Sequence, residues 1–369
     1  MRALAAWLLV VALPAMVVAQ ESTTLRPSDE LDRRRAAMPT PRADLFSING
    51  ALLGTLQWIA NGERGKNSGF GAGSLDVNVI VRPSDSVRFF LDVEGLAGLG
   101  PDQRLGTLSR LHDDADRLGG KHEAVFIREL YLRVAWLDER VRFSVGKLDV
   151  AHYFDRNFFA EDPTTQFLDS SLVNNPMLRP PPNGPGAALR VSMGDWRYAF
   201  GVHAPADVDG DLSGRPFLVG ELGHRNIFAL KGHYRWWARV GSVPEDRRRV
   251  TWGTGISIDQ LVTPDVGVFL RAGLSREQDD ALTSHAWSAG VQVTPTWFAR
   301  PDDRFGFGYS DQREATGRER MLETYYRLFV DAHLMVVANV QWVMSGPNQV
   351  TGRTNRDLVV PGLRVLVLF

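Results

Sequence analysis

The fold is decided by residues 75–94, which read LDVNVIVRPSDSVRFFLDVE. Apolar side chains occupy the odd positions from 75 to 81 and from 87 to 93, and most even positions are polar. A period of two is typical of a half-buried strand, and Pro83-Ser84-Asp85 between the two runs favours a tight turn. The stretch therefore predicts a β-hairpin with one apolar face and one polar face.

The same pattern repeats along the rest of the chain and predicts an all-β protein. The further predicted strands are 45–60, 124–136, 141–146, 187–193, 196–203, 217–223, 227–241, 250–259, 265–275, 285–293, 304–309, 321–331, 336–345 and 355–369. Short turns alternate with longer loops at 99–120, 150–186, 204–216, 242–249, 276–283, 310–320 and 346–354. This organisation predicts a transmembrane antiparallel β-barrel of about 16 strands, with short periplasmic turns and longer external loops. Strand boundaries this soft leave 14 or 18 strands open.

The two ends of the sequence predict an outer-membrane address. Residues 1–19 combine a charged start, a short apolar run and small residues at 17–19, and are expected to be a cleaved signal peptide. Residues 20–43 are polar and are expected to be flexible, so the barrel domain is 44–369. The last predicted strand ends in Phe369 with apolar residues two apart before it. This ending resembles the signal read by the outer-membrane assembly machinery, which makes that machinery and outer-membrane lipid expected partners.

Composition excludes several classes of protein. The chain has no cysteine, so neither disulfides nor lipid attachment to an N-terminal Cys is expected. The net charge is −1, which implies no bulk attraction to nucleic acid. The sequence contains none of the GxSxG, P-loop or CxxC motifs, and its histidines lack metal-ligand spacing. We therefore predict no enzyme, no cofactor and no metal.

One predicted connection is unusually long and rich in charged and aromatic residues. Residues 146–176 read GKLDVAHYFDRNFFAEDPTTQFLDSSLVNNP, and a Pro/Gly run follows up to Gly186. A loop of this length inside a compact domain is usually functional. Counting strands makes it the third external loop, and we expect residues 147–186 to fold into the barrel and constrict a pore.

The polar face of each predicted strand must point into the lumen, because lipid-facing charge is costly. Acids and bases there alternate with aromatics, as in a site that holds a neutral sugar by hydrogen bonds and ring stacking. The alternative is that these charges merely neutralise one another and brace the wall. The candidate pore-lining or sugar-binding residues on the strands and the long loop are Glu129, Tyr131, Arg133, Asp155, Arg156, Glu161, Asp162, Lys231, Arg235, Trp237, Arg271, Glu323, Arg327 and Arg364.

Short motifs in order along the chain resemble the OprB-type carbohydrate-selective porins. They are GKLD at 146–149, FD at 154–155, NFFA at 157–160, QFL at 166–168, NNP at 174–176, ETYY at 323–326, QWV at 341–343 and PGLR at 361–364. The resemblance covers nearly the whole chain after residue 43. It implies a monomeric sixteen-stranded barrel that admits small sugars by passive diffusion.

Four alternatives stay open beside this reading. The lumen chemistry also suits a general diffusion porin or a structural barrel with a plugged lumen. An outer-membrane hydrolase would need a lipid-facing Ser/His/acid group, which the sequence does not offer. The alternating carboxylates of residues 207–214 resemble a calcium loop, but the sixth position lacks Gly and the twelfth is Leu218, so an acidic external loop is favoured. Residues 112–116 show a weaker form of the same pattern.

Overall fold

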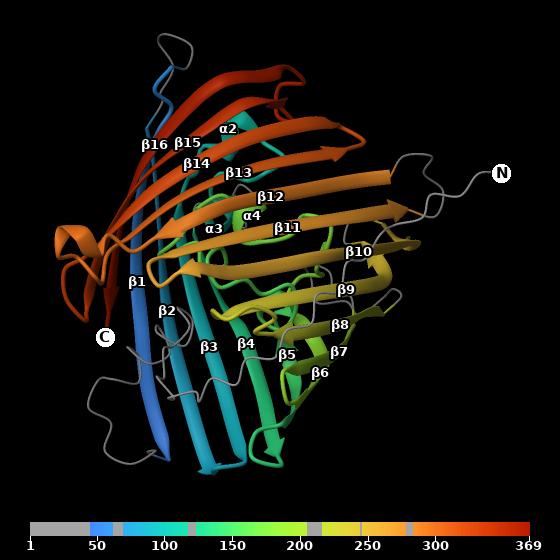
Figure 1. The fold of residues 1–369 in the computed structure, drawn as a ribbon. Helices are drawn as coiled ribbons and strands as arrows, with labels where there is room; N and C mark the ends of the chain where they lie inside the picture. Colours follow the sequence, from blue (N-terminus) through green and yellow to red (C-terminus); the bar gives the residue numbers. More distant parts are fainter. Residues whose placement is uncertain (1–44, 62–68, 117–122, 205–215, 244–245, 278–282) are drawn as a thin grey trace.

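The chain forms one closed antiparallel β-barrel of sixteen strands (Figure 1). The computed structural model describes residues 45–61, 69–116, 123–204, 216–243, 246–277 and 283–369. Each strand pairs with its sequence neighbours, and β1 closes the barrel on β16 through Ala51 opposite Leu368. The predicted fold class and strand number are therefore confirmed.

The strands account for most of the described residues. Their bounds are β1 Phe46–Trp58, β2 Gly69–Ser84, β3 Val87–Gly98, β4 Glu123–Trp136, β5 Val141–Leu148, β6 Gly184–Met193, β7 Trp196–His203, β8 Phe217–Arg225, β9 Gly232–Val243, β10 Asp246–Thr263, β11 Val266–Glu277, β12 Thr283–Val293, β13 Arg304–Glu314, β14 Gly317–Phe329, β15 Leu334–Pro347 and β16 Thr354–Leu368.

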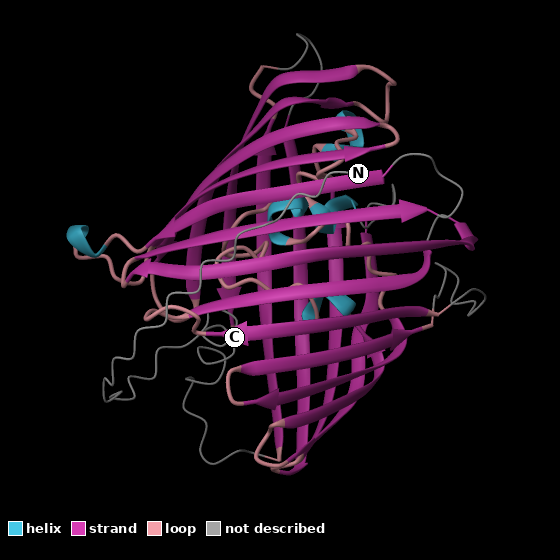
Figure 2. Cartoon of the chain, turned by 45° about the vertical axis from the view of Figure 1, so that its right-hand side comes forward, coloured by secondary structure: helices cyan, strands magenta, loops and turns pink. Residues whose placement is uncertain are grey.

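Short helical segments lie in the connections between strands. They are α2 Asp102–Leu105, α3 Asp113–Asp116, α4 Ser170–Val173 and the 3-10 turns η1 Val150–His152 and η2 Thr296–Phe298. None of the helices in the described part of the chain has the length and apolar content needed to cross a bilayer. Figures 1 and 2 show α2, α3 and α4 enclosed by the strands, whereas η2 lies outside one end of the barrel.

The two ends of the barrel differ in their connections. At one end, called the turn end below, consecutive strands are joined by tight turns such as 85–86, 137–140 and 194–195. At the other, the loop end, the connections include the two long segments 99–122 and 149–183. Both long segments carry the short helices that lie inside the barrel, so the interior is narrowed from the loop end.

Some predicted boundaries are wrong. The predicted loops 242–249 and 310–320 are mostly strand, because Val243 pairs with Asp246 and Glu314 pairs with Gly317. The polar residues there lie on strands that extend to the loop end of the barrel. Strand ends that project beyond the apolar layer of a membrane do not need apolar side chains at alternate positions. Conversely, β9 begins at Gly232 and not at 227, so Lys231 belongs to the β8–β9 connection and is exposed there. The predicted segments 1–19 and 20–43 and the candidate calcium loop at 207–214 lie outside the described residues.

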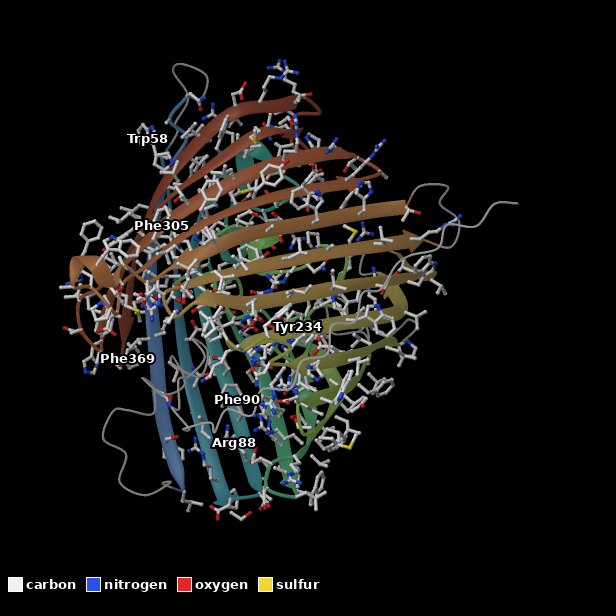
Figure 3. All side chains as sticks on the ribbon, viewed as in Figure 1. Trp58, Arg88, Phe90, Tyr234, Phe305 and Phe369 are labelled. Carbon is white, nitrogen blue, oxygen red and sulfur yellow. The ribbon has the colours of Figure 1, made fainter. Side chains whose placement is uncertain are left out.

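Many outward-facing side chains on the strands are large and apolar, as the alternation predicts. Trp58, Phe305 and Phe369 are among the exposed aromatic side chains of this outer surface (Figure 3). Leu130, Trp136, Trp236, Trp342 and Leu363, which lie on the apolar faces that must point away from the lumen, are exposed as well. The buried residues instead fill the interior: Phe159, Phe167 and Leu172 of the long loop pack against Phe269 and Tyr325 of the wall. The barrel therefore has its core inside and its apolar surface outside.

Candidate permeation pathway

The long loop is attached to the barrel wall through Asp155. Its side chain accepts hydrogen bonds from Arg271 Nε at 2.8 Å and from Trp237 Nε1 at 2.7 Å. Its backbone N–H donates to Glu221 Oε2 at 2.8 Å. The Asp155 backbone has φ 57°, a left-handed conformation, which Asp tolerates better than most residues. Three strands, β8, β9 and β11, thus converge on one loop residue.

The second half of the loop is held by a different part of the wall, strands β14 and β16. Glu323 on β14 accepts from the backbone N–H groups of Leu168 and Asp169 at 2.8 and 2.9 Å. Arg364 on β16 donates to the carbonyl oxygens of Gln166 and Pro163. Burial raises the pKa of the loop carboxyl of Asp169 well above its usual range. Backbone groups that the loop would otherwise leave unsatisfied are thereby paired with wall side chains.

The segment 99–116 also lies inside the barrel (Figure 1), which the pattern of the sequence did not predict. Glu319 on β14 accepts from the backbone N–H groups of Leu108 and Ser109, at 3.1 and 2.8 Å. Gln341 on β15 donates to the carbonyl oxygen of Leu111 at 2.9 Å. The sequence signal was present, since Leu105 and Leu111 are apolar residues in a polar segment and both are buried. The interior is narrowed by two loops and not by one.

A β-bulge on β4 brings two consecutive charged residues to the inner face. Asp92 pairs with Glu129 and Val93 pairs with Ile127, so Arg128 is the extra residue. Before the bulge Val125 and Ile127 are exposed outward, whereas after it Leu130 is. The bulge therefore changes the outward positions from odd to even numbers, as an inserted residue must.

Arg128 lies in an acidic group on the inner wall. Its guanidinium is 3.5 Å from Asp149 and 3.9 Å from each of Asp76 and Glu94. His152 Nδ1 lies 2.9 Å from Glu129 Oε2, and the His152 side chain remains 47% exposed. Because Asp76, Asp149 and Arg128 are also partly exposed, this group borders the solvent inside the barrel.

A second group on the inner wall combines aromatic rings with arginines near the turn end. Phe90 stacks on Tyr131 with ring centroids 5.0 Å apart. Arg133 lies 5.2 Å from the Tyr131 ring centroid and donates to the Tyr131 hydroxyl at 3.3 Å. Arg88 pairs directly with Arg133 across the β3–β4 ladder, and both are half-buried. Figure 3 shows Arg88 and Phe90 close together near one end of the barrel.

The predicted candidate residues divide by their exposure. Asp155, Trp237, Arg271, Glu323 and Arg364 are buried and hold the loop to the wall. Arg235 is buried in an ion pair with Asp259 at 2.9 Å, and Arg327 donates to the Asp302 carbonyl at 3.3 Å. Glu129 is buried but adjoins exposed His152, while Tyr131 is 9% exposed. The half-buried residues are Arg133, Arg156, Glu161 and Asp162, of which Arg156 and Glu161 form an ion pair.

Three comparisons place this geometry among known proteins. The model of the family described as "Carbohydrate-selective porin, OprB family" matches residues 228–369. A high-pH structure of Pseudomonas putida OprB is similar with a TM-score of 0.69, at 14% identity, covering 93% of this chain and 96% of that one. A structure of Salmonella typhi OmpF in complex with daunomycin is similar with a TM-score of 0.57, at 8% identity, covering 88% of this chain and 97% of that one.

A sequence relative adds little about activity. An uncharacterised protein of Aquifex aeolicus is 24% identical over 207 residues, which are 56% of this chain and 60% of that protein. The chain thus spans about 60% of the length of this curated relative. The two structural likenesses, both well below 25% identity, establish a porin fold. The match to the family model covers β9 to β16, the C-terminal half of the barrel, and the solved structures extend the likeness in fold to the rest of it.

Proposed function

We propose that the chain is an outer-membrane porin through which small carbohydrates diffuse passively. The observation that carries the proposal is the group of half-buried Phe90, Arg133 and Arg88 around buried Tyr131, on the inner wall of a barrel narrowed by two loops. Sugars present apolar ring faces and hydroxyl edges. An aromatic pair flanked by guanidinium donors matches both features.

The narrowing loops support selection over free diffusion. Because each is tied to the wall by buried hydrogen bonds, the passage keeps a fixed cross-section and large solutes are excluded. Transport of this kind needs weak binding and no covalent step, so the proposal includes no catalytic centre and no cofactor. The apolar outer surface supports contact with membrane lipid, and Phe369 stays a predicted signal for the assembly machinery. A monomer is proposed on the family resemblance alone.

The half-buried loop pair Arg156 and Glu161 is a proposed secondary contact for solutes. Both side chains are about one-fifth exposed, unlike Asp155 beside them, which is buried in its contacts with the wall. Asp162, by contrast, accepts from the backbone N–H and the hydroxyl of Thr164, so part of its capacity is used within the loop. We expect Arg156→Ala to alter sugar binding more than Asp162→Asn does.

Single-channel recording in planar bilayers tests the function. Added monosaccharide should reduce the ion current, and Tyr131→Leu should raise the half-blocking concentration roughly fivefold, because a lost ring contact is worth about 1 kcal/mol. Phe305→Leu is the matched control, since Phe305 lies on the outer surface and should leave block unchanged.

Three outcomes of the recording would contradict the proposal. A large current that no sugar reduces would identify a general diffusion porin. Absence of current from a correctly folded protein would identify a plugged barrel. Equal block in the wild type and in Tyr131→Leu would remove the aromatic group from the sugar site.

A further inference from the structure

Five arginines form a row on the outer surface at the loop end, which we call the basic belt. Their neighbours along the strands, including Ser275, Gln312 and Glu319, are buried on the inner side, so by alternation the arginines point outward. All five are exposed. The belt consists of Arg276 on β11, Arg313 on β13, Arg318 and Arg320 on β14, and Arg356 on β16.

Strand pairing makes the belt continuous. Arg313 lies directly opposite Arg318 in the β13–β14 hairpin, and His285 on β12 lies opposite Arg313 on the other side. Ser345 on β15 lies opposite both Arg320 and Arg356. Directly opposed like charges destabilise a sheet, so the Arg313–Arg318 pair has a cost that an anionic partner would remove.

The belt retains a net positive charge after its internal contacts are counted. Arg318 forms a bidentate contact with Asp311, with Nε to Oδ1 at 2.9 Å. Arg320 donates to the Ser345 hydroxyl at 3.2 Å. Among the described residues, Arg276, Arg313 and Arg356 have no salt bridge to a carboxylate. A cationic surface of this kind suits phosphate groups, which arginine binds in a bidentate manner.

An aromatic band lies immediately below the belt, nearer the middle of the barrel. Trp287 and Tyr309 have ring centroids 5.2 Å apart, and Phe307 and Trp342 are exposed at the same outer surface. Aromatic rings at this position are typical of the boundary between the apolar layer and the headgroup layer of a membrane. The belt therefore lies at headgroup height, on the side of the narrowing loops.

We propose that the basic belt binds phosphorylated glycolipid headgroups of the outer leaflet. The inference rests on the outer-membrane location in the proposed function, but not on sugar transport. Guanidinium groups from four strands would contact the phosphates of one or two lipid molecules, whose acyl chains would lie along the aromatic band. A bound lipid would also relieve the repulsion between Arg313 and Arg318.

The test is titration of the detergent-solubilised full chain with bis-phosphorylated lipid A, followed by native mass spectrometry and thermal unfolding. The triple variant Arg276→Gln, Arg313→Gln and Arg356→Gln should bind about a hundredfold more weakly at low ionic strength, since each charge near an anionic lipid surface contributes about fivefold. Arg140→Gln is the control, because Arg140 lies in the exposed β4–β5 turn at the opposite end and should bind as the wild type does.

Further arms separate the possible sources of phosphate. Dephosphorylated lipid A should bind no better to the wild type than to the triple variant, and inorganic phosphate should compete only weakly. Equal affinity for phosphatidylglycerol, equal affinity for both forms of lipid A, or unchanged binding in the triple variant would each overturn the proposal. Sugar block of the current should be unchanged in the triple variant, so failure of this inference is distinguishable from failure of the porin function.

Discussion

Arg271 Nε donates a 2.8 Å hydrogen bond to Asp155 Oδ2, joining strand β11 to a loop residue 116 positions earlier in the chain. The two side chains are only 2% and 3% exposed. A buried ion pair contributes little net stability, but removing one partner leaves an uncompensated charge. The pair therefore fixes where the long loop lies. Loss of the pair should lower the stability of the protein and change its conductance.

We predict that Arg271→Gln lowers the free energy of unfolding by about 3–5 kcal/mol, because Asp155 stays buried without its cation. The loop should also loosen, giving a larger and noisier single-channel current. Denaturant unfolding in detergent and planar-bilayer recording measure the two effects. In Arg142→Gln, which breaks an exposed pair with Glu139, the free energy of unfolding should change by at most about 1 kcal/mol. Comparable losses in both variants would show that the buried pair does not anchor the loop.

Charge on the inner wall should set ion preference. Replacing Arg88 by Gln removes a positive charge near the turn end and should shift the reversal potential in a KCl gradient toward cation preference. Asp76→Asn should shift it the opposite way. Both shifts should shrink as salt rises toward 1 M, where the Debye length is about 3 Å. Shifts of the same sign would place at least one of the two side chains away from the ion path.

The bulge at Arg128 predicts an unusual tolerance to deletion. Deleting Arg128 would place Ile127 next to Glu129, so that outward and inward positions alternate regularly through β4. We expect the deletion to insert and fold, measured as the heat-modifiable band of a folded barrel on gel electrophoresis. Ile127→Asp, with the chain length unchanged, should reduce folding because Ile127 faces outward. Failure of the deletion variant to fold would indicate that the bulge itself is required.

Alternation of apolar and polar residues predicted the strands because successive side chains of a membrane barrel face lipid and lumen in turn. It placed Leu130, Trp136 and Trp342 outward and Glu129 and Arg271 inward, as the structure has them. Alternation did not identify Arg128 as an inserted residue. A bulge is recognised only from the pairing with the neighbouring strand, which the sequence of β4 alone does not give. Alternation also predicted that Glu323 would line the pore, and the composition of the long loop predicted the same of Asp155, whereas the structure buries both against loop backbone or wall side chains. A pattern of period two reports which face a residue is on, but not what covers that face.

The two loops inside the barrel should be separable by mutation of β14. Glu319→Gln weakens the hydrogen bonds to residues 108 and 109, and Glu323→Gln weakens those to 168 and 169. We expect trypsin to cleave after Arg110 faster in the first variant and after Arg156 faster in the second, as identified by mass spectrometry of the fragments. Identical cleavage patterns in the two variants would show that the loops move as one unit.

A side chain at position 255 should be destabilising, because the ring of Trp237 packs directly against Gly255. A Cβ at this position would be 2.4 Å from Trp237 Cζ2, and the two residues are directly paired across β9 and β10. Gly255→Ala must displace the indole and so break its hydrogen bond to Asp155, at a cost of about 1–3 kcal/mol. Gly54→Ala is the matched control, since no atom lies within 4 Å of the Cβ that it adds.

A double-mutant cycle separates this close contact from a general effect of strand glycines. In the Trp237→Leu background the ring is absent and only the 2.7 Å approach to the Ala272 carbonyl oxygen remains, so adding Gly255→Ala should cost less than it does in the wild type. The same background should already show a looser long loop, because Asp155 has lost its indole donor while keeping Arg271. Additive costs would mean that Gly255 is required for the backbone conformation of β10 and not for the position of the Trp237 ring. Gly255 would then have no role in anchoring the long loop through Trp237 and Asp155.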